Sequence, residues 1–241
     1  MLVKTKAIVL NSLKYGESQI IVDIFTESHG RLSFIQKLTN SRRAGVKKQF
    51  FQPLTLLSIE FDWRPSQKLQ RIREAVVSCP FTSLPFDAFK LSIGLFVAEF
   101  TGYCTRSEQA NPALYLFIEN SVRWLDACQG GFANFHIVYM LHMTRFIGFY
   151  PNLDDDDSKE FFDMREGRFV ANAPVHTDFL GPEEAVKIRL LMRLNYATMR
   201  LLSLSRGERN RIVDVILQYY RLHQPGFPEM KSLPVLAQLF S

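Results

Sequence analysis

The sequence predicts an α+β protein, in which a small antiparallel β-barrel is followed by a mainly α-helical domain. Two observations support this class: hydrophobic residues alternate with a period near two up to residue 78, and from residue 80 they recur every three or four residues. The 241 residues are 47% apolar, which suffices for a sizeable core and excludes a disordered or fibrous chain. We expect a barrel over residues 1–79 and a helical domain over residues 80–241, with an irregular acidic excursion at residues 151–182.

Five strands are expected in the barrel, each rich in β-formers and bounded by turn signals. They cover residues 6–10, 20–25, 32–35, 54–61 and 69–77. Five short strands without a helix pattern between them favour a closed or nearly closed barrel. An OB-fold is the leading candidate and an SH3-like barrel is the second. Both can bind nucleic acid, proteins or sugars, so the barrel alone does not define a function.

Helical periodicity follows the barrel. A first helix over residues 86–100 is apolar on nearly all sides, which is typical of a central helix. Asn111 as N-cap and Pro112 as first helical residue start a second helix. A third is expected over residues 132–149, and residues 185–204 are helical in period, in two pieces.

The C-terminal part contains one more strong helix, which begins with a capping box from Ser205 to Glu208. A short tail over residues 233–240 is expected to add a final turn of helix. The acidic excursion before these helices is expected to hold a small hairpin within residues 161–170.

Charge is distributed unevenly along the chain, although the net charge is only +5. Residues 1–79 hold 13 Lys and Arg against 6 Asp and Glu, whereas residues 151–182 hold 3 against 8. Residues 183–241 are basic again, with 9 against 5. A polyanion would therefore bind the two ends of the chain.

A basic loop interrupts the strand pattern after residue 37. Its charged members are Arg42, Arg43, Lys47 and Lys48. A basic loop between strands, with aromatic residues beside it, suits a nucleic-acid backbone, and a solvated surface loop is the alternative. Phe34, Phe50 and Phe51 could stack on bases, but phenylalanine on a strand more often belongs to a core.

A second basic cluster surrounds the start of the capped helix. It consists of Arg200, Arg206, Arg209 and Arg211. These side chains could bind an acidic partner, either a phosphate backbone or the carboxylate end of a peptide. The alternative is that they solvate helix faces.

The sequence lacks the patterns of an active site or a metal site. There is no GxSxG nucleophile, no Gly-rich phosphate loop, and no HxH or HExxH spacing. The aspartates at 154–157 are contiguous, whereas calcium loops place their ligands at alternating positions, so a solvated loop is favoured over a metal site. We expect a binding protein, not an enzyme, with no catalytic residues.

The compartment is expected to be the cytoplasm. The three cysteines are widely spaced without a CxxC pair, which indicates thiols in a reducing environment. The opening residues form too short an apolar run for a signal peptide, and the most apolar later stretch is interrupted by Glu99 and too short to span a membrane.

Three segments of the sequence are informative together. The first is KAIVLNSLKYGESQIIVDIFTESHGRLSFI, followed by the basic loop and QPLTLLSIEF. The second is FIGFYPNL and the third is LHQPGFPEMKSLPVL. Together they resemble the RecO family of bacterial recombination mediators: the second resembles the GYxPxL segment that precedes the zinc-ribbon insertion of that family, and the third resembles its C-terminal motif. The resemblance covers essentially the full length.

The resemblance implies an N-terminal OB-fold and a helical C-terminal domain. It also implies a nucleoid-associated protein that binds single- and double-stranded DNA and anneals complementary strands. Its partners would be RecR and the C-terminal tail of single-stranded-DNA-binding protein, and it would help load the RecA recombinase onto coated DNA. By position, the four loop residues named above fall in the basic loop of the family's barrel, with Arg31 and Lys37 flanking it on the adjoining strand.

One departure from the family concerns zinc. Many members hold a zinc ion with four cysteines after the GYxPxL segment, but residues 152–174 contain no cysteine. Because such a site requires thiolate ligands, we predict that there is no zinc and no other cofactor. Packing of Phe161, Phe162, Phe169 and Val170 would hold the excursion instead. The alternative function is a protein–protein interaction scaffold whose barrel does not bind nucleic acid.

Overall fold

The computed structural model describes residues 1–37, 46–106, 109–153 and 160–239. Packing divides the chain into two compact units. The first unit contains Met1–Ala127 and Met230–Leu236, and the second contains Cys128–Glu229 and Ala237–Ser241. The boundary predicted after residue 79 stays a prediction, since these units group residues by their contacts.

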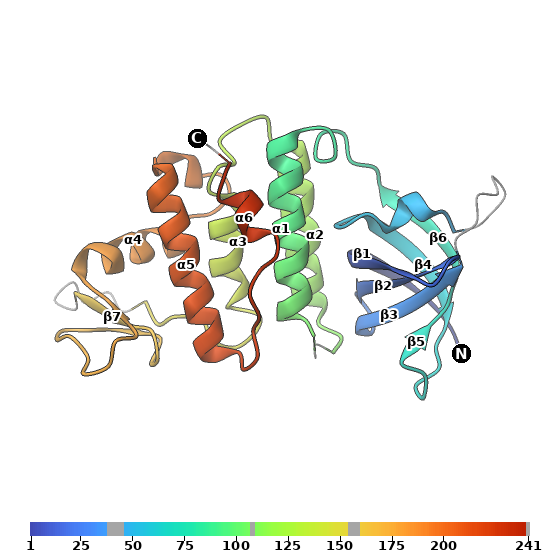
Figure 1. Cartoon of the computed structure of the whole chain (residues 1–241), viewed down its shortest axis with the longest axis horizontal. Helices are drawn as coiled ribbons and strands as arrows, with labels where there is room; N and C mark the ends of the chain where they lie inside the picture. Colours follow the sequence, from blue (N-terminus) through green and yellow to red (C-terminus); the bar gives the residue numbers. More distant parts are fainter. Residues whose placement is uncertain (38–45, 107–108, 154–159, 240–241) are drawn as a thin grey trace. The chain divides into compact units, whose positions relative to one another are not determined.

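A curled six-stranded sheet forms the N-terminal part of the first unit (Figure 1). Its strands are β1 (Leu2–Tyr15), β2 (Gln19–Thr26), β3 (Gly30–Lys37), β4 (Leu56–Asp62), β5 (Leu69–Gln70) and β6 (Ile72–Cys79). The order is β5-β3-β2-β1-β4-β6, and all neighbours are antiparallel except β3 and β5. The predicted class, an OB-type barrel followed by helices, is confirmed.

The fifth predicted strand consists of two strands in the structure, and this division closes the curl. β5 pairs with β3 on one edge of the sheet, and β6 pairs with β4 on the other. The side-chain amide of Gln36 on β3 donates to the carbonyl of Ile72 at 3.0 Å and accepts from its N–H at 3.2 Å. The two edges are therefore linked by a side chain that substitutes for a backbone ladder.

Alternate residues of the strands fill the interior of the barrel. Inward-facing members include Val9, Val22 and Phe34, and all three are fully buried. Phe51, from the 3₁₀ helix η1 (Lys48–Phe51), completes this core, and Phe50 packs against it. Phe34 and Phe51 therefore have a core role, and their rings have no exposed face on which a base could stack.

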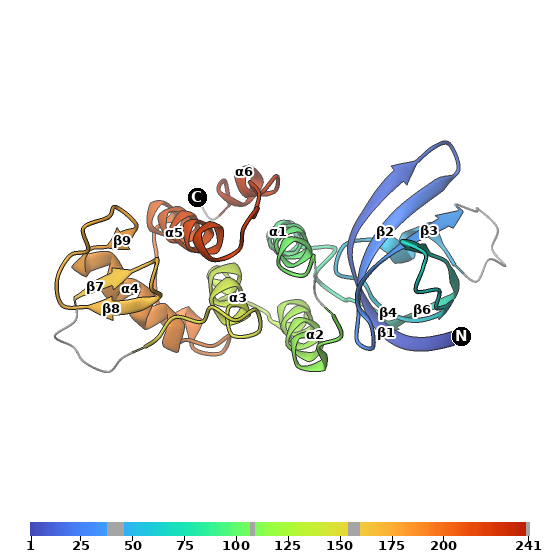
Figure 2. The same cartoon turned by 90° about the horizontal axis from the view of Figure 1, so that it is seen from below.

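Two long helices cover part of the outer face of the barrel (Figure 2). These are α1 (Ala88–Cys104) and α2 (Pro112–Ala127). The Asn111 side chain accepts from the N–H of Leu114 at 3.0 Å, which confirms the predicted helix start. The ring of Phe25 on β2 stacks on Tyr115 of α2 with centroids 6.5 Å apart. The helices therefore shield the apolar residues on this part of the outer face from water.

The linker between β6 and α1 is fixed to the end of α2 by the carboxylate of Asp126. That group accepts the backbone N–H groups of Thr82, Ser83 and Leu84 at 2.8–3.1 Å. Burial acts to raise the pKa of Asp126, but these N–H donors outweigh burial, so the pKa lies below its usual value. The ammonium of Lys90 donates to the Asp126 carbonyl at 3.0 Å. The barrel and the first two helices are thus joined by a bonded linker.

A C-terminal strap, residues 230–236, returns to the first unit and includes the short helix α6 (Leu233–Leu236). The Glu99 carboxylate on α1 accepts the N–H groups of Lys231 and Ser232 at 2.9 and 2.8 Å, and the hydroxyl of Ser232 at 2.5 Å. The strap is therefore bonded to a helix more than 130 residues earlier in the chain.

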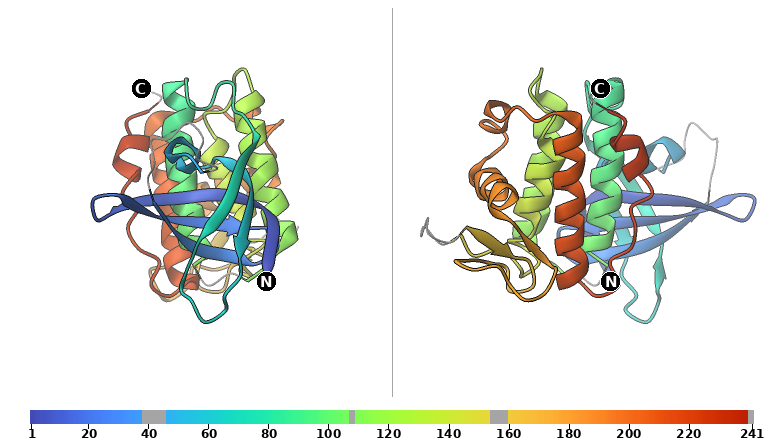
Figure 3. Two further views of the ribbon diagram at one scale, coloured as in Figure 1. Left: turned by 90° about the vertical axis from the view of Figure 1, so that its right-hand side faces the viewer. Right: turned by 60° about the vertical axis from the view of Figure 1, so that its left-hand side comes forward.

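The second unit combines helices with a small sheet (Figure 3). Its elements are α3 (Phe135–Met143), β7 (Phe161–Asp163), β8 (Arg168–Val170), β9 (Phe179–Leu180), α4 (Pro182–Arg193), η2 (Met199–Leu201) and α5 (Arg206–His223). The predicted hairpin is confirmed as β7 and β8, and the predicted capping box is confirmed at Ser205 and Glu208. The third helix ends at Met143, earlier than predicted, because turns follow it.

Aromatic packing holds the small sheet to α5 and α4. Phe162 and Phe169 are buried with ring centroids 5.0 Å apart, and Phe162 also contacts Tyr219 of α5 at 5.9 Å. The guanidinium of Arg189 on α4 lies 4.2 Å above the Phe169 ring. Within the described ranges, no helix has the length and apolar character needed to cross a bilayer.

Candidate nucleic-acid interface

All three predicted DNA-binding lysines are exposed on the barrel. Lys37 ends β3, Lys47 precedes η1 and Lys48 begins it. Among the described residues, no carboxylate pairs with any of these ammonium groups. Because they have no such partner, the three lysines can exchange counterions for phosphates without breaking an ion pair to any described residue. Arg42 and Arg43 lie outside the described residues.

Arg31, the remaining predicted residue of this group, is engaged within the first unit. Its guanidinium pairs with Asp23 at 3.0 Å and donates to the Gly102 carbonyl of α1 at 2.7 Å. The hydroxyl of Ser33 donates to the same aspartate at 2.5 Å. The Arg31 side chain is only 16% exposed. It thus fastens β3 to β2 and to α1.

A basic groove that we did not anticipate lies at the loop between β4 and β5. Its exposed cations are Arg64, Lys68 and Arg71, and Ile35 and Leu69 also line it. The carboxylate of Asp62 also lines the groove, but Arg73 pairs with it at 2.6 Å. These cations are separated from one another by two or three residues and form no charge run, so only the net charge of residues 1–79 pointed to them.

The location of this groove agrees with the general ligand surface of OB-folds. That surface is the face of the second and third strands, bordered by the loops after the first strand and before the last. Here the loop between β4 and β5 carries Arg64 and Lys68, β5 and β6 together take the place of the last strand, and β3 contributes Ile35. Lys37 lies two residues farther along β3 on the same side of the sheet.

The second basic cluster is used differently. Arg209 is 7% exposed, and its guanidinium donates to Asn134 Oδ1 at 3.3 Å and to the Leu204 carbonyl at 3.0 Å. Burial lowers the pKa of this guanidinium. The Asn134 amide in turn donates to the carbonyls of Met199 and Leu202. Arg209 therefore holds the segment before α5 and does not face solvent.

The other three arginines of this cluster are exposed, with different degrees of engagement. Arg206 donates to the Ala237 carbonyl at 2.9 Å, and Arg211 pairs with Glu184 at 2.7 Å. Arg200 lies in η2 beside Gly131, without a carboxylate partner among the described residues. The structure places Arg211 on a groove and buries Arg209 away from it.

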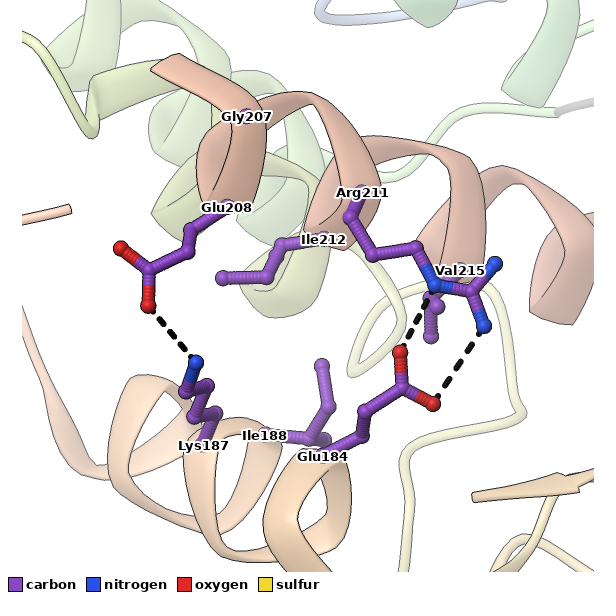
Figure 4. Close-up of a pocket in the computed structure, with 8 residues that line it drawn as sticks. All are labelled: Glu184, Lys187, Ile188, Gly207, Glu208, Arg211, Ile212 and Val215. Carbon is purple, nitrogen blue, oxygen red and sulfur yellow. Dashed lines mark hydrogen bonds and ion pairs between the residues drawn. The ribbon is translucent and has the colours of Figure 1, made fainter. Parts of the chain in front are cut away.

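An apolar groove with a charged rim separates α4 and α5 (Figure 4). Ile188, Ile212 and Val215 line its apolar part. Two ion pairs cross it: Lys187 with Glu208 at 2.7 Å, and Arg211 with Glu184 at 2.7 Å. Lys187 and the capping bonds from Ser205 lower the pKa of Glu208 to about 2. The two cations of the rim are therefore each paired with a carboxylate of the rim.

The described residues contain no cluster of potential metal ligands. No three His, Cys, Asp or Glu side chains there lie close enough to share an ion. The aspartates at 154–157 are outside those ranges. The three cysteines are free thiols. The absence of a zinc ion stays a prediction.

Comparison with known proteins identifies the family. Residues 1–81 match the family model described as "Recombination protein O N terminal", and residues 85–233 match "Recombination protein O C terminal". The chain belongs to the RecO family. It is 48% identical to a RecO relative from Phocaeicola vulgatus, 46% to one from Bacteroides fragilis and 35% to one from Flavobacterium psychrophilum, each over the full length of both chains. These RecO relatives are all named DNA repair protein RecO. Membership places the chain among DNA repair and recombination proteins.

Proposed function

We propose that this RecO-family chain is a non-catalytic recombination mediator. It binds single- and double-stranded DNA through its barrel, anneals complementary strands, and helps load the RecA recombinase onto DNA coated by single-stranded-DNA-binding protein. The observation that carries this proposal is a set of exposed cations on an OB-type barrel that have no carboxylate partner among the described residues. They are Lys37, Lys47, Lys48, Arg64, Lys68 and Arg71.

The mechanism follows from counterion release. Each lysine or arginine that contacts a phosphate displaces condensed cations, so affinity does not depend on sequence and falls as salt rises. Two complementary strands held on one basic surface lose most of their mutual repulsion, which favours pairing. No covalent step is needed, so we propose neither a catalytic residue nor a zinc ion or other cofactor.

The proposed protein partners are RecR and the C-terminal tail of single-stranded-DNA-binding protein. The groove between α4 and α5 supports a site for an acidic tail, because an apolar floor lies between Lys187 and Arg211. Carboxylates of the tail would replace Glu184 and Glu208 as partners of these cations. Arg200 and Arg206 are exposed on the same unit and extend the positive surface, whereas Arg209 supports the fold beneath it. We propose a cytoplasmic, nucleoid-associated location.

The first test is binding of a labelled single-stranded oligonucleotide, followed by fluorescence anisotropy at several salt concentrations. The wild type should bind, with log affinity falling linearly with log salt. Replacing Arg42, Arg43, Lys47 and Lys48 with Ala should reduce the slope by about three, because each phosphate that a single strand has neutralised adds about 0.7 to the slope.

Lys4→Ala is the matched control, because Lys4 is exposed on the same barrel but pairs with Glu60 at 2.8 Å. It should leave the slope unchanged. Equal affinities of the fourfold variant and the wild type would instead support the scaffold alternative, in which the barrel binds protein. A strand-annealing assay on the same proteins separates binding from annealing.

A further inference from the structure

A pocket of about 640 Å³ lies in the first unit beside the barrel. Three segments supply its walls: the outer face of the β1–β2 hairpin, one side of α1, and the strap. The hairpin extends away from the rest of the sheet (Figure 2), whereas Gly102 of α1 lies close to Leu10 at its base. Small-molecule sites have volumes of roughly 300–1,000 Å³, so this pocket is large enough for a ligand.

The apolar part of the lining comes from both the hairpin and the helix. Leu13 of β1 is 58% exposed, and Leu95 of α1 is 42% exposed. Leu10 and Ala98 also line the pocket and are buried. A ligand with an apolar body would remove the two exposed leucines from water. All four side chains are aliphatic, so they suit an alkyl chain and offer no ring for stacking.

The two carboxylates of the lining already have donors within the protein. Asp23 pairs with Arg31 at 3.0 Å. Glu99 accepts the hydrogen bonds from the strap and also the hydroxyl of Tyr103 at 3.1 Å. Burial acts to raise the pKa of Glu99, but these donors outweigh burial, so the pKa lies below its usual value. Neither carboxylate therefore requires a cation from a ligand.

Two cations of the lining have no carboxylate partner among the described residues. These are Arg106 and Lys231, and both are exposed. They are held near one another, because the N–H of Lys231 donates to Glu99 and the Arg106 guanidinium lies 4.7 Å above the ring of Tyr103, which bonds to the same Glu99. With Arg31, three cations line the pocket against two carboxylates, so its lining has a net positive charge.

Other charges of the hairpin do not change this sign. Lys14 and Glu17, near its tip, are exposed, have opposite charges and do not line the pocket. The pocket also shares no lining residue with the basic groove between β4 and β5. An anion is therefore attracted to this pocket independently of the groove.

We propose that this pocket binds a small organic anion with an alkyl chain. The chain packs against Leu13 and Leu95, and a single carboxylate or phosphate head group accepts hydrogen bonds from Arg106 and Lys231. Such a ligand contacts the hairpin, α1 and the strap together, so it stabilises the folded first unit by mass action. The inference does not rest on the proposed function, because it uses none of the cations assigned to DNA.

Isothermal titration calorimetry of the full chain tests the pocket with four probes: octanoate, octyl phosphate, 1-octanol and inorganic phosphate. The preferred amphiphile should bind at least about tenfold more tightly than 1-octanol, which lacks the charge, because hydrogen bonds to charged groups contribute roughly that factor. It should exceed inorganic phosphate, which lacks the chain, by a similar factor, because each buried methylene adds affinity. The tighter of the two amphiphiles identifies the head group.

Arg106→Ala combined with Lys231→Ala removes both cations and keeps the backbone N–H that bonds to Glu99. Both side chains are exposed, so the variant should fold normally. Its affinity for the preferred amphiphile should fall at least about tenfold, toward that of 1-octanol. Leu13→Ser should weaken the amphiphile by about fivefold and leave inorganic phosphate unaffected.

Lys14→Ala is the matched control, because it removes an exposed cation from the same hairpin that does not line the pocket. It should bind every probe like the wild type. Thermal unfolding of each variant checks that the fold is intact, and the preferred amphiphile should raise the thermal midpoint of the wild type but not that of the double variant.

Several outcomes would overturn the inference. Equal affinities for 1-octanol and the amphiphiles would mean that charge has no role, and equal binding by the folded double variant would place the ligand elsewhere. No heat from either amphiphile at millimolar concentration would exclude this class of ligand. Displacement of the amphiphile by a single-stranded oligonucleotide would make the pocket part of the DNA surface instead. Failure of the wild type to bind DNA would overturn the proposed function and leave the pocket unaffected.

Discussion

The cations of the barrel and those of the α4–α5 region both lie in basic parts of the sequence, but they have different structural roles. On the barrel, Lys47 and Lys48 have no carboxylate partner among the described residues. In the second unit, Lys187 and Arg211 each have one across a groove. The difference lies in where the acidic side chains are placed. A basic cluster binds an external anion readily only where the fold leaves its cations unpaired.

The largest expected effect tests the internal role of Arg209. Replacing it with Leu removes the donors to Asn134 and Leu204 and leaves buried acceptors unsatisfied. We expect the free energy of unfolding to fall by about 3 kcal/mol, measured by urea denaturation. The DNA affinity of the folded fraction should not change.

The control for Arg209 is Arg206→Leu, which removes an exposed arginine three residues earlier on the same helix. Its cost should stay below about 1 kcal/mol. If both substitutions cost the same, the distinction between a structural and a surface arginine in this cluster is lost.

An intermediate effect concerns pH. Burial, and then the charge of Arg209, lower the pKa of His136 to about 3, so this imidazole is neutral in the folded protein. The unfolded chain takes up the proton near pH 6.5, so stability is complete above that pH and is lost as pH falls toward 3. At pH 5 the loss should be about 2 kcal/mol.

Urea unfolding of the wild type and of His136→Gln between pH 5 and pH 7.5 measures this effect. The variant has no titrating group at this position, so its stability should vary less with pH. The same slope in both proteins would show that His136 is not the group responsible. Burial and the charge of Arg145 also lower the pKa of His142, and this histidine is present in both proteins.

The smallest expected effect tests whether paired cations can be released. Glu184→Gln with Glu208→Gln frees Lys187 and Arg211, and Gln at position 208 can still complete the capping box. We expect duplex DNA to bind about threefold more tightly at low salt, with a salt slope larger by up to about two, because each freed cation that neutralises a duplex phosphate adds about 0.9. The thermal midpoint should change little, because both pairs are exposed.

Anisotropy titrations with the single-substitution proteins are the natural comparison for that double variant. An unchanged slope would mean that this region does not contact DNA even when its cations are unpaired. The α4–α5 region would then differ from the barrel in the location of its cations and not in whether those cations form ion pairs.

Local signals in the sequence predicted most of the fold. The N-cap at Asn111, the capping box at Ser205 and the hairpin of β7 and β8 depend on residues a few positions apart, and all three are present. The class of the barrel followed from the period of its strands. These features need no knowledge of long-range packing.

The candidate site was less predictable because it depends on contacts between distant residues. The engagement of Arg31 requires Gly102 of α1, and the burial of Arg209 requires Asn134. The outer face is harder still, since the register of β1 shifts between Val9 and Asn11. A shift of one residue exchanges the two faces of a strand, so the sequence alone does not show that Leu13 points outward.

The bond between Glu99 and the strap has a consequence for the order in which the protein matures. The chain leaves the first unit after Ala127 and returns to it at Met230, so the first unit receives its last segment only after about a hundred further residues have been synthesised. Until then, the Glu99 carboxylate has the Tyr103 hydroxyl as a donor but lacks the donors of the strap, and the surface of α1 beneath the strap is uncovered. A ribosome that stalls within the second unit therefore leaves a barrel with an uncovered helix, which is the kind of surface that chaperones and proteases recognise.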